Sequence, residues 1–151
     1  MDPEYGRARR NLIKLLFDQN RNRDAEQESN RYIEYAPEDH IAWCDLGLSQ
    51  WRLEKYDESA SSYLKSVSID PSNPEAWFHL GSVRLLQAEY KKSEYATRKA
   101  LALDPNPDLA HMLWHNLAMA LTHQNKNPKQ VLSCHMKMAR SIEIARHHER
   151  E

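Results

Sequence analysis

The chain has 151 residues, 40% of them apolar, with 21 basic and 22 acidic side chains. This is the size of one ordinary domain with a core, and the balanced charge argues against a broad nucleic-acid or anionic-membrane surface. No apolar run approaches the roughly 18 residues of a membrane span. The two cysteines form no CxxC pair, and the start of the chain lacks the layout of a secretory signal. We therefore expect a cytoplasmic protein.

The chain contains only three glycines, Gly6, Gly47 and Gly81. They cannot form a glycine-rich phosphate loop, a dinucleotide fingerprint or a G-x-S-x-G elbow. Cys44 and His40 lie one helical turn apart, but a Cys-His pair without an oxyanion hole is weak evidence for catalysis. The sequence thus predicts a protein that is not an enzyme and needs no cofactor.

A period of 34 residues runs through the chain. Pro37, Pro71 and Pro105 are separated by it, and so are the stretches Trp43–Gly47 and Trp77–Gly81. A fixed period of this size indicates an architecture of stacked repeats, which usually presents an extended concave binding surface.

In chain order, the first predicted unit spans residues 6–39 and is divergent, because it has Leu12 and Ala25 at helical positions but lacks the tryptophan. The units at 40–73 and 74–107 are regular. Each has two amphipathic helices, judged from the spacing of its apolar residues.

The second regular unit shows where these helices begin and end. Asn73-Pro74 and Asn106-Pro107 are good starts, since asparagine caps a helix and proline fits its first position. The second helix of the unit is predicted over Tyr90–Leu103, and Asp104-Pro105 ends it because proline disfavours a helical conformation in the preceding residue.

The fourth unit, residues 108–127, breaks the period. Trp114 follows Trp77 by 37 residues, so three extra residues lengthen the start of its first helix. A long helix at 128–148 is predicted to cap the stack. Its inward residues are Val131, Leu132, Met138, Ile142 and Ala145, and its outward residues are Lys129, Ser133, Lys137 and Arg140.

Gly47 and Gly81 fall inside helices, where glycine costs roughly 1 kcal/mol relative to alanine. Their shared register predicts a steric reason, the close approach of the paired second helix. Ser59 and Ser93 are expected to lie opposite them.

These residues resemble the tetratricopeptide repeat (TPR) family, whose pattern is Trp, two residues, Leu-Gly, then Tyr, a small residue, an aromatic and Pro. The matching residues are Trp43, Leu46, Gly47, Tyr56, Ser59, Tyr63 and Pro71, then Trp77, Leu80, Gly81, Tyr90, Ser93, Ala100 and Pro105. Gln50 and Arg84 depart from it, because the family favours tyrosine there. The resemblance implies one all-α domain over 1–151, with about eight helices in antiparallel pairs stacked into a right-handed superhelix (an α-solenoid).

In this family the first helix of each pair lines a concave groove that binds a peptide or helix of a partner protein. Trp43 and Trp77 then belong to the core, whereas Trp51, Phe78 and Met119 are binding candidates, since exposed apolar anchors carry most binding energy. The implied groove residues are Arg10, Lys14, Phe17, Asp45, Leu48, Trp51, Arg52, Phe78, His79, Ser82, Leu85, Leu86, His115, Asn116 and Met119.

Some members of the family bind the acidic C-termini of chaperones through a clamp of lysine, asparagine and arginine. Here Asp45 or His79 stands where the asparagine is needed, and Glu75 stands where a lysine is needed. Asp45 would repel a carboxylate, so we predict no chaperone-tail binding.

Two alternatives remain open. The chain could be a self-associating scaffold subunit whose terminal repeats dock end to end. It could also be a metal- or pH-responsive module, because His111, His115 and His123 share one helix face and histidine pairs can bind zinc. No Cys, Asp or Glu joins this stripe. The leading hypothesis is a protein-binding adaptor.

Overall fold

The structure is a computed structural model that describes residues 3–148, and side chains from residue 5 to residue 145. The extreme chain start and residues 149–151 lie outside the described part. Residues 3–148 form eight α-helices and no strand, as the all-α prediction requires. The helices are α1 (Pro3–Asp18), α2 (Asn22–Tyr35), α3 (His40–Arg52), α4 (Tyr56–Ile69), α5 (Pro74–Leu86), α6 (Tyr90–Leu101), α7 (Pro107–His123) and α8 (Pro128–His148).

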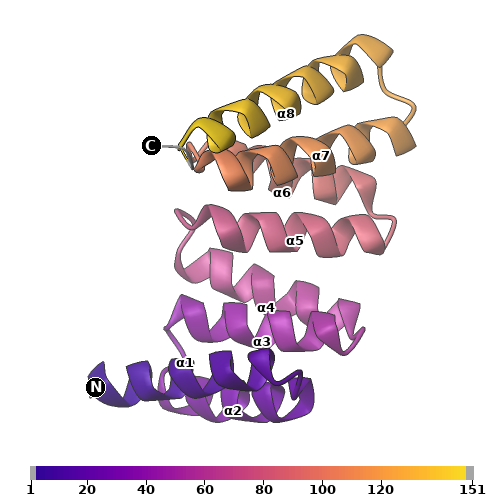
Figure 1. The fold of residues 1–151 in the computed structure, drawn as a ribbon. Coiled ribbons are helices and arrows are strands. Elements are labelled where there is room, and N and C mark those ends of the chain that lie inside the picture. Colours follow the sequence, from indigo (N-terminus) through magenta and orange to yellow (C-terminus); the bar gives the residue numbers. More distant parts are fainter. Residues whose placement is uncertain (1–2, 149–151) are drawn as a thin grey trace. The chain divides into compact units, whose positions relative to one another are not determined.

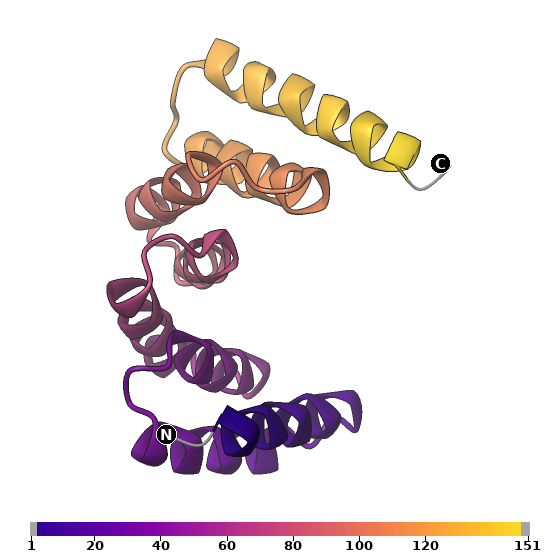
Figure 2. The same cartoon turned by 90° about the vertical axis from the view of Figure 1, so that its left-hand side faces the viewer.

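The helices divide into two compact units, residues 1–71 with α1–α4 and residues 72–151 with α5–α8. Inside each unit, every helix packs against the next one along the chain, and consecutive helices run antiparallel (Figure 1). The first helices also contact each other, α1 with α3 and α5 with α7. At the C-terminal end of unit 2, α8 lies alongside α7 (Figure 2).

Side chains cap the starts of the first helices as predicted. The side-chain oxygen of Asn73 accepts from the backbone N–H of Glu75 and Ala76, and that of Asn106 accepts from Leu109. Pro74 and Pro107 occupy the first turns. These caps satisfy N–H groups that have no partner inside the helix, which fixes where each helix begins.

The turn after each first helix repeats in backbone geometry. Asn20, Glu54, Ala88 and Asn125 all have a positive φ, between 51° and 60°, at steps of 34, 34 and 37 residues. In each turn the next residue donates its N–H to a carbonyl five positions back, for example Lys55 to Gln50 at 2.9 Å. This is the bond of a Schellman cap, which satisfies a free carbonyl at a helix end.

One predicted helix boundary differs from the structure, and one predicted lengthening is confirmed. Helix α6 ends at Leu101 and not at Leu103, because Asp104 has φ 50° and a left-handed residue cannot continue a right-handed helix. Helix α7 has 17 residues, against 13 in α3 and in α5. This extra turn at its start confirms the predicted insertion before Trp114.

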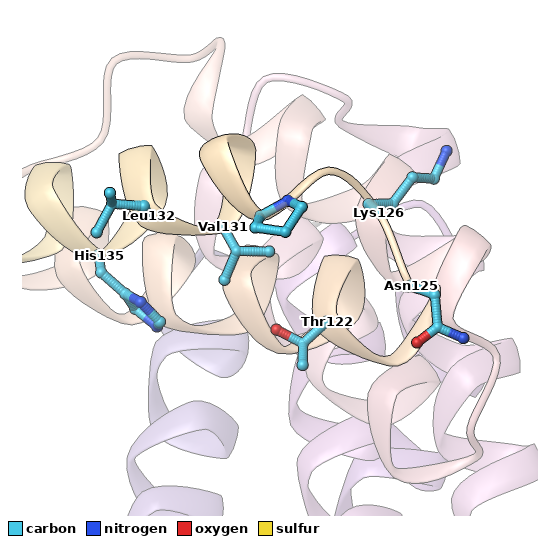
Figure 3. Close-up of a pocket in the computed structure, with 7 residues that line it drawn as sticks. Thr122, Asn125, Lys126, Val131, Leu132 and His135 are labelled. Atoms are coloured by element: carbon cyan, nitrogen blue, oxygen red, sulfur yellow. The ribbon is translucent and has the colours of Figure 1, made fainter.

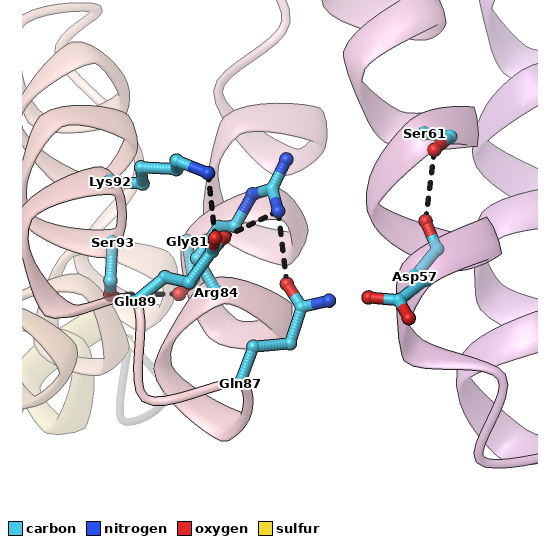
Figure 4. A network of polar contacts seen from close by, with 8 residues as sticks. All are labelled: Asp57, Ser61, Gly81, Arg84, Gln87, Glu89, Lys92 and Ser93. Carbon is cyan, nitrogen blue, oxygen red and sulfur yellow. Dashed lines mark hydrogen bonds and ion pairs between the residues drawn. The ribbon is translucent and has the colours of Figure 1, made fainter.

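Gly47 and Gly81 lie where the paired second helix comes close. A Cβ added to Gly47 would lie 3.0 Å from the Tyr63 ring, and one added to Gly81 would lie 2.8 Å from Thr97 Oγ1. Ser59 Oγ donates to the Gly47 carbonyl at 2.7 Å, and Ser93 Oγ donates to that of Gly81 at 2.8 Å (Figure 4). The predicted steric reason is confirmed.

Polar side chains replace the tyrosines that the family favours. Buried Gln50 accepts a hydrogen bond from Ser62 Oγ at 2.7 Å. Arg84 pairs with Glu89, which Lys92 also contacts at 2.6 Å (Figure 4). Hydrogen bonds and charge pairs inside each helix pair thus replace the missing aromatic packing.

The tryptophans and the last helix differ in part from the predictions. Trp43 and Trp77 were predicted to lie in the core, but both are only half-buried. In α8, Val131, Met138, Ile142 and Ala145 are half-buried, but Leu132 is 59% exposed, so its predicted inward position is wrong. Cys134, at 5% exposure, instead packs against α7.

Candidate functional site

In unit 1 the predicted groove residues come from α1 and α3, which contact each other. The Arg52 guanidinium lies 4.8 Å from the centre of the Phe17 ring, and its Nη1 donates to the Phe17 carbonyl at 3.0 Å. Trp51, next to it, is 41% exposed. Trp51 is thus exposed, and the Arg52 guanidinium is held in place by α1.

Asp45 is a half-buried acidic residue on this face. Burial raises the pKa of Asp45 to about 7, Asp39 adds to the rise, and the Arg10 guanidinium opposes it. A carboxyl group of this pKa is partly protonated near neutral pH. Two further groove residues were predicted in unit 1. Leu48 is half-buried, and Lys14 is exposed.

In unit 2 a side-chain hydrogen bond connects the first helices α5 and α7. Asn116 Nδ2 donates to Ser82 Oγ at 2.8 Å, and Ser82 Oγ donates to the Phe78 carbonyl at 3.0 Å. Asn116 is only 8% exposed. Ser82 and Asn116 were both predicted to line the groove, but the hydrogen bond between them was not predicted. It holds the two first helices in one register.

Phe78 and His79 are half-buried, although both were predicted to line the binding groove. Their rings lie 5.1 Å apart, and Phe78 packs against the buried cluster of Ala100, Leu109 and Leu113. Burial lowers the pKa of His79 to about 4, so this imidazole is neutral at physiological pH. Phe78 therefore has a structural role in the α5–α6–α7 core.

The exposed part of this face is made by other predicted residues. Leu86 is 55% exposed and Met119 is 38% exposed. His115 is exposed as well, and Leu85 is half-buried. Among the predicted groove residues of unit 2, the exposed apolar ones are therefore Leu86 and Met119.

The structure also shows a pocket that the sequence did not indicate. The sequence predicted that Leu132 faces the stack, whereas in the structure Leu132 lines this pocket. The pocket lies between the end of α7 and the start of α8 and has a volume of about 490 Å³ (Figure 3). Thr122, Asn125 and Lys126 line one side, and Val131, Leu132 and His135 line the other.

The histidine stripe is not brought into a metal centre. Among the described side chains, no group of three or more His, Cys, Asp or Glu is placed to hold a metal ion. His123 stacks on the Tyr90 ring with centroids 4.6 Å apart. His111 is half-buried on α7.

The pair of His40 and Cys44 has structural contacts. His40 Nε2 lies 3.5 Å from an Asp70 carboxylate oxygen. Cys44 Sγ lies 3.0 Å from Ser66 Oγ, which donates to the His40 carbonyl. These contacts tie the start of α3 to the end of α4.

None of the helices within residues 3–148 is long and apolar enough to cross a membrane.

Several known proteins are similar to this chain. A *Caenorhabditis elegans* protein named tetratricopeptide repeat-containing protein trd-1 is 29% identical over 100 residues, which are 66% of this chain and 13% of that protein. The chain thus spans only a small part of this relative.

Solved structures show the same fold at low sequence identity. The crystal structure of MamA has a TM-score of 0.84 at 15% identity, covering 95% of this chain and 82% of MamA. The TPR2B domain of yeast Sti1 in complex with an Hsp70 peptide has a TM-score of 0.74 at 18% identity, covering 78% and 96%. The first TPR of Spaghetti (RPAP3), bound to the HSP90 peptide SRMEEVD, has a TM-score of 0.77 at 15% identity, covering 83% and 98%.

Residues 17–141, most of the chain, match the family described as the cilia and flagella-associated protein 70 middle TPR-like domain. Together with the 34-residue period and the paired helices, this match shows that the chain belongs to that family and has a TPR fold.

Proposed function

We propose that this domain is a non-catalytic protein-interaction module, an adaptor that holds a peptide or helix of a partner protein on the faces of its first helices. Its family and its fold support this role, since two structures of the same fold hold Hsp70 and HSP90 peptides. Stacked repeats commonly bind through the surface that their repeated helices present.

The exposed Trp51 is the observation that carries the proposal. A tryptophan that is 41% exposed offers an aromatic anchor, and Arg52, the next residue on α3, is held on Phe17. Tryptophan and arginine are the residues most enriched at binding hot spots. Leu86 and Met119 offer further apolar contacts in unit 2.

The same residues argue against a chaperone-type carboxylate clamp. Arg52 is engaged with Phe17, and the charge of Arg10 lowers the pKa of Asp45. A partner carboxylate near Asp45 would meet a half-buried acidic group. We therefore propose partners that insert apolar side chains and that lack a terminal acidic motif.

The test begins with selecting a binding peptide from a displayed library and measuring its affinity by titration. We expect Trp51→Ala to weaken binding at least about tenfold and to change the free energy of unfolding by less than about 1 kcal/mol. Leu86→Ala should weaken it as well. The matched control is Leu64→Ala, since Leu64 is 44% exposed on a second helix. Binding that is unchanged in both Trp51→Ala and Leu86→Ala would refute the proposed face.

A further inference from the structure

We propose that the C-terminal pair α7–α8 carries a second binding surface, separate from the first-helix faces. It accepts an amphipathic helix of a partner protein, apolar on one side and acidic beside it. The surface is centred on the α7–α8 pocket shown in Figure 3.

The register of the repeats identifies this surface. A step of 37 residues relates Ala88 to Asn125, the turn residues after α5 and α7. The same step relates Glu94 and Arg98 on α6 to Val131 and His135, which line the pocket on α8.

The two α6 residues lie where α7 packs against α6. Glu94 accepts a hydrogen bond from Gln124 Nε2 at 2.9 Å. Arg98 lines a cavity with Trp114 and Leu117 of α7. On α8, Val131 and His135 thus stand at the positions that on α6 lie beside the next helix.

Next to these positions, α8 is apolar where the end of a repeat stack is expected to be polar, because terminal repeats must face water. Leu132 is 59% exposed and Met136 is 66% exposed. Val131 stands where α6 has the charged Glu94. Exposed apolar residues gathered on one helix face mark an interaction site.

Methionine is concentrated on this helix pair. Apart from Met1, the methionines of the chain are Met112, Met119, Met136 and Met138, all on α7 or α8. Flexible, polarizable methionine side chains are used at surfaces that bind apolar helices. Met119 belongs to the first-helix face, whereas Met136 and Met138 lie on α8 and favour an amphipathic helix as the occupant there.

Charge complementarity selects an acidic partner. Lys126 and His135 line the pocket, and no acidic residue does. Over residues 107–148 the sequence has five Lys and Arg residues but only two acidic ones, Asp108 and Glu143. Opposite charges around an apolar contact steer association and fix its register.

The probe is a synthetic helical peptide of about 18 residues, with leucine at i, i+3, i+4 and i+7 and glutamate on the flanks. It is titrated into the full chain carrying ¹³C-methyl methionine. We expect saturable binding, with shifts at the Met136 and Met138 methyl signals on α8 and none at Met119, which lies on the first-helix face. A scrambled peptide of the same composition should produce no such shifts. Leu132→Glu should weaken binding at least about tenfold.

The matched control is Leu64→Glu, which places the same charge at another exposed leucine and should leave binding unchanged. Met136→Glu gives a second variant on the same face, and circular dichroism checks that each variant is folded. No saturable binding, or equal binding by Leu132→Glu and Leu64→Glu, would overturn the proposal. If the chain dimerises without peptide and Leu132→Glu abolishes the dimer, the occupant is a second copy, and the assignment to a partner helix is wrong.

Discussion

Ala88 has a backbone conformation that is poorly suited to its side chain, because its φ is 58°. An L-residue in this left-handed region is strained by its Cβ, whereas glycine is not. We therefore predict that Ala88→Gly stabilises the protein by about 0.5–1 kcal/mol, net of the greater chain entropy of glycine. Urea unfolding measures this difference.

The control is Ala102→Gly, since Ala102 ends α6 with an ordinary φ of −73°. That change should give no gain. A loss of stability in Ala88→Gly equal to that in Ala102→Gly would show that the turn is not strained. The sequence did not predict this turn geometry, because Glu54 and Ala88 are neither glycine nor asparagine. The need to reverse the chain between packed helices imposes it.

Asp45 makes the stability of the protein depend on pH. Its pKa is raised in the folded state to about 7, so the folded protein holds this proton more tightly than the unfolded chain does. The raised pKa of Asp45 therefore stabilises the folded state, relative to the unfolded chain, least at high pH. This contribution is fully present below pH 4 and is lost as pH rises through 7. Asp45→Asn, which mimics the protonated form, should therefore stabilise the protein at pH 8 by about 1–3 kcal/mol, with little effect near pH 4.

Urea unfolding of both proteins at the two pH values tests this. His79, whose pKa is lowered, contributes the opposite trend, but it is common to both proteins and cancels in the comparison. Asp18→Asn, at an exposed acid, is the control. An equal effect of Asp45→Asn at both pH values would mean that Asp45 is ionised throughout.

At the scale of elements, the contact between Gly81 and Thr97 limits how large residue 81 can be where α5 packs on α6. A Cβ at position 81 would lie 2.8 Å from Thr97 Oγ1, while its other neighbours lie at 3.5 Å. We predict that Gly81→Ala destabilises the protein by about 1–2 kcal/mol. In a Thr97→Ala background it should instead stabilise by up to about 1 kcal/mol, since alanine favours the helix over glycine. A double-mutant cycle measured by thermal unfolding tests the change of sign.

Gly47→Ala serves as the comparison, because its Cβ would lie 3.0 Å from the buried Tyr63 ring, which cannot move aside. If Gly81→Ala stays destabilising without the Thr97 hydroxyl, the backbones themselves are too close. The sequence predicted the close approach from the shared register of the glycines. It could not name Thr97 as the contact, since that depends on the rotation of α6.

The helices themselves were largely predictable, since caps, prolines and apolar spacing are local signals. The additional turn of α7 followed from the 37-residue step before Trp114. The outward position of Leu132 did not, because helical spacing gives the angle between residues but not which side of the last helix finds a neighbour. Phe78 shows the same limit, since its contact with Leu109 and Leu113 is made across helices.

For the molecule as a whole, the proposal that the domain has no carboxylate clamp gives a clear expectation. The HSP90 peptide SRMEEVD binds the TPR of Spaghetti, which shares the fold of this chain. We predict no saturable binding of that peptide here at concentrations up to about 100 µM, because Asp45 opposes a second carboxylate. Isothermal titration calorimetry is the measurement. Micromolar binding that is lost in Arg10→Ala or Arg52→Ala would contradict it.

The fold of the molecule could be predicted from the sequence, because a 34-residue period is a global signal that survives the loss of single residues. The candidate site could be predicted only as a set of positions on first helices. Which of them are accessible depends on packing: Trp51, Leu86 and Met119 are exposed, whereas Asn116 and much of Phe78 are enclosed.

The packing of each helix on its chain neighbours also has a consequence for dynamics. Helix α8 packs chiefly on α7, whereas α7 is held by α5, α6 and α8. Local opening in such an array begins where a helix has fewest neighbours. Amide hydrogen exchange should therefore be fastest in α8 among the helices of unit 2. A ligand seated in the α7–α8 pocket would slow that exchange, so exchange rates in α8 can report occupancy of the pocket before any partner is known.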